Sequence, residues 1–312
     1  MRQVVVKEFG SPEVLAVEAV PDPVAGPGEV LIEISAVHVL WVETAVRRGD
    51  GQAWFPLRPP YVPGTGVVGV EAGSGRRVAA HTGRGGGYAD RVVVPATQVT
   101  VVPDEPSDQE AVALVHDATT ALSLFDVLAV GARDRVLVVG ASGGLGLVSL
   151  HLAKARARQV LALARGEKKV ARIRELGFDV VDTGSPHWLA EARALLPAGA
   201  DVVLDNVGGE LGAASVALVS DGARWSSHGT PGGSFTSIDP AEVQRRRLSV
   251  HGIGAAQFDT AQRMRLMRRG LELAASGELS TVVGQTFPLE LAGEAHRAIE
   301  ERRVFGATVL VP

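Results

Sequence analysis

The glycines between Gly140 and Gly146 are the residues whose spacing points most clearly to chemistry, and the stretch reads Gly-Ala-Ser-Gly-Gly-Leu-Gly. An apolar run from Arg135 to Val139 predicts a strand before them, and helical spacing follows them. In such a unit, Gly143 would let the backbone approach a pyrophosphate, and Gly146 would let the helix lie close to the strand. The free N–H groups of the helix would face the phosphates. The stretch predicts a dinucleotide site, with an ordinary tight turn as the alternative.

The residues after the next strand bear on which dinucleotide is bound. A site for NAD usually has an acid there, about twenty residues after the glycines. This chain has Ala164 and Arg165 at that point, followed by Lys168 and Lys169. Basic side chains attract a 2′-phosphate, and the missing acid removes the repulsion that would exclude it. The pattern favours NADPH over NADH, with a solvated basic helix start beside Glu167 as the alternative.

Length and composition limit the number of domains and the kinds of partner that this chain can have. The 312 residues are enough for two domains, and 46% hydrophobic with 21% charged residues is typical of a soluble globular protein. A net charge of -4 argues against nucleic acid as a partner, and the absence of cysteine excludes disulfides and thiolate metal sites. No run approaches the roughly 18 apolar residues of a membrane span, and the start lacks the apolar core of a signal peptide. We therefore expect a cytoplasmic protein that does not bind membranes.

The elements that must position these residues fall into two groups. The first hundred residues read as short strands with glycine and proline turns and one helix from Trp41 to Arg48. Ser107 and Glu110 have the spacing of a capping box, and the helical pattern after them is expected to form two helices broken near Asp117. Strands then alternate with helices as far as a strand from Leu248 to Ile253, which predicts an α/β fold with a doubly wound parallel sheet.

The last fifty residues return to a mixed pattern, with a long helix from Thr260 and a final strand from Thr308 to Val311. This short tail must pack on another part of the chain. We therefore expect a discontinuous β-rich substrate or catalytic domain (residues 1–118 and 258–312) and a nucleotide-binding domain (residues 119–257).

Several stretches together resemble the zinc-independent branch of the medium-chain dehydrogenase/reductase superfamily, the quinone oxidoreductase (zeta-crystallin-like) family. They fall in the family's order along nearly the whole chain: Val42 to Gly49, Pro60 to Gly64, Gly87 to Asp90, Thr119 to Leu122, Ala141 to Gly146, Val203 to Gly209 and Gly306 to Pro312. The resemblance implies a GroES-like β-rich domain, a Rossmann domain, NADPH as the cofactor and a homodimer. The strand from Leu248 to Ile253 is the candidate for pairing at the dimer interface.

The sequence argues against a metal. The metal-binding relatives have Gly-His-Glu where this chain has Gly64-Thr65-Gly66, and they use cysteines that it lacks. The eight histidines show no paired ligand spacing.

The fingerprint, the strand-end rule and the resemblance together assign contacts to the cofactor. The expected cofactor-binding residues are Thr120, Ser142, Gly143, Gly144, Leu145, Gly146, Arg165, Lys168, Asn206, Val207, Gly208, His228, Ile253 and Arg302. Thr183 stands where many relatives place a tyrosine against the 2′-phosphate. Structural turns, a solvated loop histidine at His228 and a surface charge cluster at Arg302 are the alternatives.

The substrate side departs from the relatives. Leu40 and Ala45 align with an asparagine and a tyrosine in many of them, which argues against a tyrosine proton donor. The expected substrate-pocket residues are Leu40, Trp41, Ala45 and Trp54. With Phe55, the residues Leu40, Trp41 and Trp54 would form an apolar wall for a flat ring or an alkenyl carbonyl, with core packing as the alternative. The two tyrosines, at 61 and 88, are interpreted as packing residues.

A hydride acceptor of this kind also needs a proton. The resemblance places the segment around His116 beside the nicotinamide, and we expect Asp117 to raise the pKa of His116. The candidate acids are therefore His116 and, second, His38, with solvent or a purely structural histidine as the alternatives.

These observations lead to one principal hypothesis and two others. The principal one is an NADPH-dependent oxidoreductase that transfers a hydride to a quinone or an α,β-unsaturated carbonyl without zinc. The others are an enoyl or ketone reductase that tailors a secondary metabolite, and a nucleotide-binding structural protein with little turnover.

Overall fold

The computed structural model describes residues 1–312, except for the side chains of residues 255 and 256. The chain divides into two compact units. Unit 1 comprises residues 1–119 and 260–312, and unit 2 comprises residues 120–259. One boundary falls inside a helix, and the other falls directly before one.

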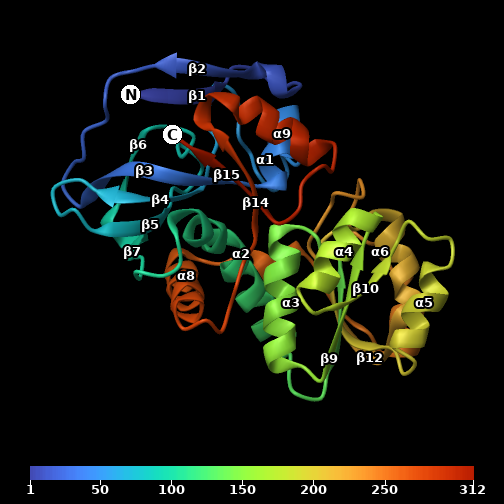
Figure 1. Cartoon of the computed structure of the whole chain (residues 1–312). Coiled ribbons are helices and arrows are strands. Elements are labelled where there is room, and N and C mark those ends of the chain that lie inside the picture. The colour runs from blue at the N-terminus through green and yellow to red at the C-terminus, as the bar shows by residue number, and fades with distance from the viewer. The chain divides into compact units, whose positions relative to one another are not determined.

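Unit 1 is built on a seven-stranded sheet in the order β14-β15-β3-β4-β5-β7, with β6 paired to β3. Its strands are β3 (Glu29–Val39), β4 (Gly66–Glu71), β5 (Arg77–His81), β6 (Arg91–Pro95), β7 (Val99–Val101), β14 (Val283–Pro288) and β15 (Ala307–Val311). The late strand β15 pairs antiparallel with the early strand β3, with Leu310 opposite Val37, and Figure 1 shows the red strands beside the blue one. The tail is therefore part of the first unit's sheet.

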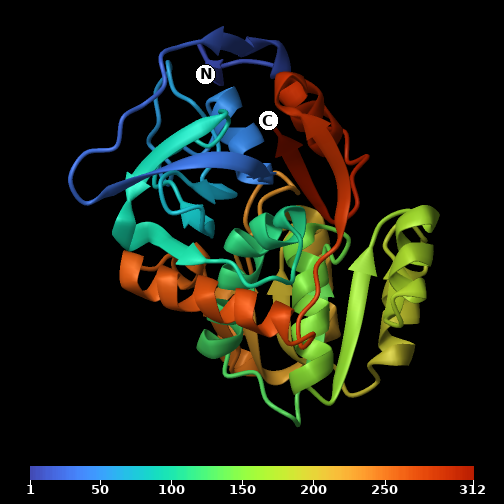
Figure 2. The ribbon, with the colours of Figure 1, turned by 60° about the vertical axis from the view of Figure 1, so that its left-hand side comes forward.

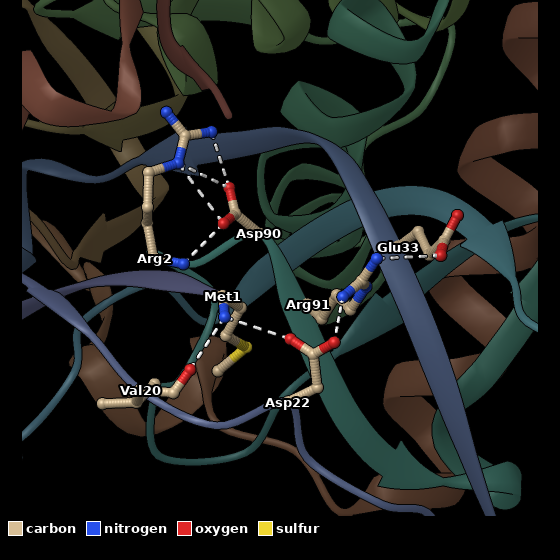
Figure 3. Close-up of polar contacts among 7 residues, drawn as sticks. All are labelled: Met1, Arg2, Val20, Asp22, Glu33, Asp90 and Arg91. Carbon is tan, nitrogen blue, oxygen red and sulfur yellow. Dashed lines mark hydrogen bonds and ion pairs between the residues drawn. The ribbon is translucent and has the colours of Figure 1, made fainter.

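Unit 1 also contains a small antiparallel sheet of β1 (Arg2–Val6) and β2 (Leu15–Ala19), which charged groups connect to the rest of the unit (Figure 3). The ammonium group of Met1 lies 3.0 Å from Asp22 and donates to the carbonyl of Val20. Asp22 also pairs with Arg91 on β6, and Arg2 pairs with Asp90 at 2.7 Å. These contacts fix the beginning of the chain against the main sheet.

The helices of unit 1 are α1 (Trp41–Arg48), α2 (Asp108–Val127, which continues into unit 2), α8 (Thr260–Ala275) and α9 (Ala292–Glu300), with 3₁₀ turns at Pro12–Val14, Ala96–Gln98 and Leu289–Leu291. Figure 2 shows α8, in orange, beside β7. The capping box is present at the start of α2, where Ser107 N donates to Glu110 at 3.0 Å.

The expected break near Asp117 is wrong, because α2 is one uninterrupted helix. Most side chains on either side of this position are buried, including Leu114, Val115 and Ala118. Packing on several sides outweighs the weak helix propensity of the polar segment around residues 116 and 117. The threonines at 119 and 120 therefore lie in the middle of a helix and not at its start.

Unit 2 has a six-stranded parallel sheet in the order β10-β9-β8-β11-β12-β13. Its strands are β8 (Arg135–Val139), β9 (Gln159–Ala164), β10 (Asp179–Asp182), β11 (Ala200–Asp205), β12 (Val219–Ser227) and β13 (Ser249–His251). Counted from β8, the order is 3-2-1-4-5-6, that of a dinucleotide-binding Rossmann sheet. The order reverses between β8 and β11, and ligands bind beyond the carboxyl ends of the strands at such a point.

The helices of unit 2 alternate with these strands and lie around the sheet (Figure 1). They are α3 (Gly144–Arg156), α4 (Glu167–Glu175), α5 (Trp188–Leu195), α6 (Gly209–Ser215) and α7 (Pro240–Arg246), with 3₁₀ turns at Val216–Leu218 and Ile253–Ala256. α7 was not expected from the sequence, although Asp239 before Pro240 is a typical start of a helix. In the part of the chain that the structure describes, no helix combines the length and apolarity needed to cross a membrane.

The expected strand from Leu248 to Ile253 is too long. The strand is only Ser249–His251, and Ile253 begins a 3₁₀ turn. β13 is an edge strand of the sheet, with Val250 42% exposed. It pairs with β12 through three residues, so little backbone is held in the sheet.

The position of Leu310 predicts that shortening its side chain will strongly lower the free energy of unfolding. Leu310 is fully buried in the core between the main sheet and α9, whereas Leu291 is 46% exposed. We expect Leu310→Ala to lower the free energy of unfolding by about 2–5 kcal/mol, because it leaves a cavity in a packed core. Leu291→Ala, the matched control, should cost less than about 1 kcal/mol. Chemical denaturation of both variants measures the difference, and equal losses would contradict the assignment of β15 to the core.

Candidate functional site

The turn after β8 is shaped by two glycines. Gly140 has a φ of +75°, and a side chain there would overlap Val207 in the loop after β11. A Cβ at Gly146 would lie 2.6 Å from the carbonyl oxygen of Gly140, so the absence of a side chain lets α3 pack against the end of β8. The two loops at the switch point of the sheet are therefore in direct contact.

Gly143 differs from these two glycines, because packing does not require it. Its φ is -84°, and a Cβ there would meet no protein atom within 4 Å. Gly143 is the N-cap of α3, a helix of 13 residues, so the first backbone N–H groups of the helix are directed to this open side. The residues of this turn fit a pyrophosphate, whose oxygens accept from such N–H groups.

The loop after β9 carries the expected basic residues. Arg165 and Lys168 are exposed at the start of α4. Asp182, which the sequence analysis did not single out, accepts from the N–H groups of Gly166 (2.9 Å) and Gly184 (2.8 Å). Because these two donors hold the carboxylate, Asp182 shapes the loop that carries the basic side chains. Its position at the end of β10 was the available signal.

The loop after β11 is fixed by the fully buried Asp205. One carboxylate oxygen accepts from the N–H groups of Val207 (3.0 Å) and Gly208 (2.8 Å), and the other accepts from the Thr236 hydroxyl at 2.5 Å. Asn206 donates through Nδ2 to the carbonyl of Val139 at 2.9 Å. The predicted cofactor residues 206–208 thus form a rigid loop beside the glycine turn.

His228 is held by this loop and is not a solvated loop residue. Its Nε2 lies 2.9 Å from Asn206 Oδ1, and its Nδ1 lies 3.0 Å from the Ser226 hydroxyl. An amide oxygen only accepts, so Nε2 carries the proton. Burial lowers the pKa of His228 to about 4. We conclude that His228 is neutral and orients Asn206.

In unit 1, two histidines lie close to a third, His116. His38 lies on β3, His81 ends β5, and His116 lies on α2. The ring centroid of His116 is 5.2 Å from that of His81 and 6.3 Å from that of His38. Its Nε2 is 2.9 Å from the Thr65 hydroxyl. Both candidate acids therefore belong to one polar cluster.

The expectation that Asp117 raises the pKa of His116 is wrong. Burial, followed by the charges of His81, His38 and Arg263, lowers this pKa well below its ordinary value. Neighbouring residues on a helix project about 100° apart, so Asp117 faces a different partner. Its Oδ2 lies 3.8 Å from His38 Nε2.

Asp117 and His38 form a buried pair without a net charge. Burial raises the pKa of Asp117 to about 8 and lowers that of His38 to about 4. At neutral pH the carboxyl group therefore holds the proton. Among the described residues, Asp117 Oδ2 and His38 Nδ1 have no hydrogen-bond partner. Sequence reasoning missed Asp117 as a proton carrier, because the pairing depends on β3 packing against α2.

This cluster does not fit a metal ion. Within the described residues, no three histidine or acidic side chains are arranged to hold one. His116 Nε2 already contacts Thr65, and the guanidinium of Arg263 lies 3.0 Å from His81 Nε2. A cation would be repelled by that guanidinium.

The expected substrate-pocket residues differ in burial. Ala45 is buried on α1, and Trp41 packs against the core of unit 1, which supports core packing for these two. Leu40 is half-buried and Trp54 is 49% exposed. Whether any of them faces a substrate stays a prediction.

The partly buried Glu43, which sequence reasoning did not single out, joins several segments near this cluster. Its carboxylate accepts from the N–H groups of Leu40 (3.0 Å) and Gly64 (3.1 Å) and from the Tyr88 hydroxyl (2.9 Å). Tyr88 is fully buried and also contacts His296 at 2.9 Å. Tyr88 is thus a core residue, as expected, and Glu43 is a structural acceptor.

Two predicted cofactor residues lie apart from these loops in the sequence. Thr120 is half-buried in the middle of α2. Arg302 is exposed after α9 and has a φ of +58°. Their contact with a cofactor stays a prediction.

The comparisons with known proteins agree with this architecture. The family model described as zinc-binding dehydrogenase matches residues 176–310. The chain is 28% identical to the quinone oxidoreductase of Mus musculus, over 96% of this chain and 94% of the mouse protein. It is 32% identical to the solved quinone oxidoreductase of Thermus thermophilus, also solved with NADPH, with a TM-score of 0.86 and both chains fully covered. It is 31% identical to a solved NAD-dependent alcohol dehydrogenase, with the same TM-score and coverage.

The raised pKa of Asp117 predicts how stability depends on pH. Asp117 keeps its proton up to about pH 8 in the folded chain, whereas an unfolded aspartate loses it near its ordinary value of 3.8. Stability is therefore lost as pH rises towards 8, by up to about 1.4 kcal/mol per pH unit from this group. Asp117→Asn should flatten this slope, because an amide has no proton to lose.

The measurement is the free energy of unfolding between pH 6.5 and 8, above the ordinary histidine value and below the raised value of Asp117. Asp126→Asn, an exposed position on the same helix, is the matched control and should leave the slope unchanged. The same slope in Asp117→Asn and the wild type would show that Asp117 is already ionised.

Proposed function

Because the chain belongs to the quinone oxidoreductase family of the medium-chain dehydrogenase/reductase superfamily, we propose that it is an NADPH-dependent oxidoreductase. It would transfer a hydride to a quinone or an α,β-unsaturated carbonyl without zinc. The observation that carries the proposal is the open glycine turn at the switch point of unit 2, where Gly143 has room that packing does not use.

Unit 2 would hold the cofactor. The N–H groups at the start of α3 would bind the pyrophosphate, and the loop at residues 206–208 would border the nicotinamide ribose. Arg165 and Lys168 would bind the 2′-phosphate, which favours NADPH even though one similar structure is that of an NAD-dependent enzyme. When bound, NADPH supplies the hydride from its nicotinamide ring.

Unit 1 would supply the polar groups that meet the acceptor. His116 is partly exposed, and it forms a polar pair with the Thr65 hydroxyl that can hydrogen-bond a carbonyl oxygen. Because its pKa is lowered, His116 acts here as a neutral hydrogen-bonding group. The proton would come from Asp117, which holds one at neutral pH, through His38 or from solvent.

Two features of the residues in unit 1 argue against zinc in this mechanism. Thr65 stands where zinc-binding relatives have a histidine, and the guanidinium beside His81 would repel a cation.

We also propose a homodimer, with β13 as an exposed edge strand that can pair with a second copy.

Gly143 provides the test of the cofactor site. Gly143→Ala should lower stability by less than about 1 kcal/mol, because its Cβ meets no protein atom and only the N-cap preference for glycine is lost, and should raise the Kd for NADPH at least about tenfold. Gly146→Ala is the matched control: its Cβ would meet backbone, so it should lower stability by about 1–3 kcal/mol. Thermal unfolding and fluorescence titration with NADPH measure both.

Wild-type affinity for NADPH in Gly143→Ala would refute the site. NADPH binding by the wild type without oxidation of NADPH by quinones or enones would instead favour a structural nucleotide-binding protein.

His116 provides the test of the acceptor site. Replacing His116 with Ala should lower kcat with an enone about tenfold or more, and should leave the Kd for NADPH unchanged, because His116 lies in unit 1. His187→Ala, an exposed histidine in unit 2, is the control and should have wild-type kcat. Unchanged turnover of His116→Ala over about pH 5 to 9 would remove His116 from the site.

A further inference from the structure

Unit 1 contains a cavity of about 230 Å³ beside the histidine cluster. Its lining includes His81, Arg84, Gln98, Thr260 and Arg263. Two of these side chains are permanent cations, and among the described residues the lining contains no carboxylate. Thr260 is the first residue of α8, a helix of 16 residues, so the positive end of its dipole lies at the cavity. The cavity therefore has the electrostatics of an anion site.

The hydrogen bonding of His81 also indicates a site for an anion. The N–H group of Gly83 approaches its Nδ1 at 3.1 Å, and a guanidinium nitrogen of Arg263 approaches its Nε2 at 3.0 Å. Both partners are donors, but a neutral imidazole has only one accepting nitrogen. At one of these nitrogens two N–H groups therefore face each other. An additional acceptor in the cavity would resolve this conflict.

The charge of Arg263 also acts on the cluster beyond the cavity. Burial and, second, the charge of Arg263 together lower the pKa of His81 to about 3, and Arg263 contributes to the lowered pKa of His116 as well. The positive potential thus extends from the cavity to the residue proposed to meet the acceptor. An anion placed in the cavity would offset it.

We propose that this cavity binds an anionic group, a carboxylate or a phosphate, carried by the hydride acceptor itself. The inference rests on the proposed function and narrows its substrate class to acidic quinones or enones. His81 lines the cavity and its ring lies 5.2 Å from that of His116. An acceptor with its carbonyl at His116 and an acidic group a few bonds away would therefore span both. Arg263 and Arg84 would pair with the acid, and a guanidinium can do so in bidentate fashion.

The experiment compares two enones that differ in one substituent, a carboxylate in 4-oxopent-2-enoate and a methyl group in 3-penten-2-one. With NADPH as the reductant, and relative to the wild type, Arg263→Met should raise KM for the acid at least about tenfold and change KM for the ketone less than about twofold. Arg84→Met should act in the same direction. Arg265→Met, an exposed arginine on the same helix, is the matched control and should affect neither acceptor. Comparing the acid-to-ketone ratio between variants cancels the difference in intrinsic reactivity.

An equal change for both acceptors, or no change, would overturn the proposal. A direct binding measurement separates its failure from that of the proposed function. If no acceptor is reduced, calorimetric titration with 4-oxopentanoate should still show binding to the wild type and loss of binding to Arg263→Met. No binding of the acid to the wild type would overturn the site. If inorganic phosphate binds to the wild type but Arg263→Met leaves KM for the acid acceptor unchanged, the cavity is a site for free anions. That result would also overturn the proposal.

Discussion

One partly buried carboxylate, that of Glu43, holds together the part of unit 1 on which the histidine cluster depends. It accepts from the start of α1, from the N–H group of Gly64 and from the Tyr88 hydroxyl. Thr65 follows directly in the chain and contacts His116. An apolar side chain at residue 43 would leave the N–H groups of Leu40 and Gly64 without this acceptor. The position of Thr65 relative to His116 follows from this arrangement.

Two buried carboxyl groups, Asp205 in unit 2 and Asp117 in unit 1, differ in how fully they are hydrogen-bonded. In unit 2, the carboxylate of Asp205 is fully buried and its oxygens accept from Val207, Gly208 and Thr236. Such a satisfied network gives a rigid loop, as a site for a large ligand requires. In unit 1, Asp117 and His38 leave buried polar atoms without partners among the described residues. The protonation state of these two groups is therefore set by burial and not by a fixed hydrogen-bond partner.

The sequence was sufficient where a signal is local. The glycine turn, the capping box at Ser107 and the helix from Trp41 to Arg48 each depend on neighbouring residues, and the structure has all three. Contacts between distant residues could not be predicted in this way. His81 and Arg263 are 182 positions apart, and Asp117 meets His38 only because β3 packs near α2. The length of α2 was also missed, because burial on several sides overrides the local preference of its polar residues.

The pairing of β15 with β3 also constrains the order in which the chain can fold during synthesis. Residues 120–259 are continuous, so unit 2 can form as soon as they have left the ribosome. The sheet of unit 1 lacks β15, which pairs with residues 37–39 of β3, until residues 307–311 have emerged. During that interval an apolar strand edge is open to pairing with another nascent chain, a known route to aggregation. The unit that begins first is therefore completed last and has the greater need of protection by chaperones.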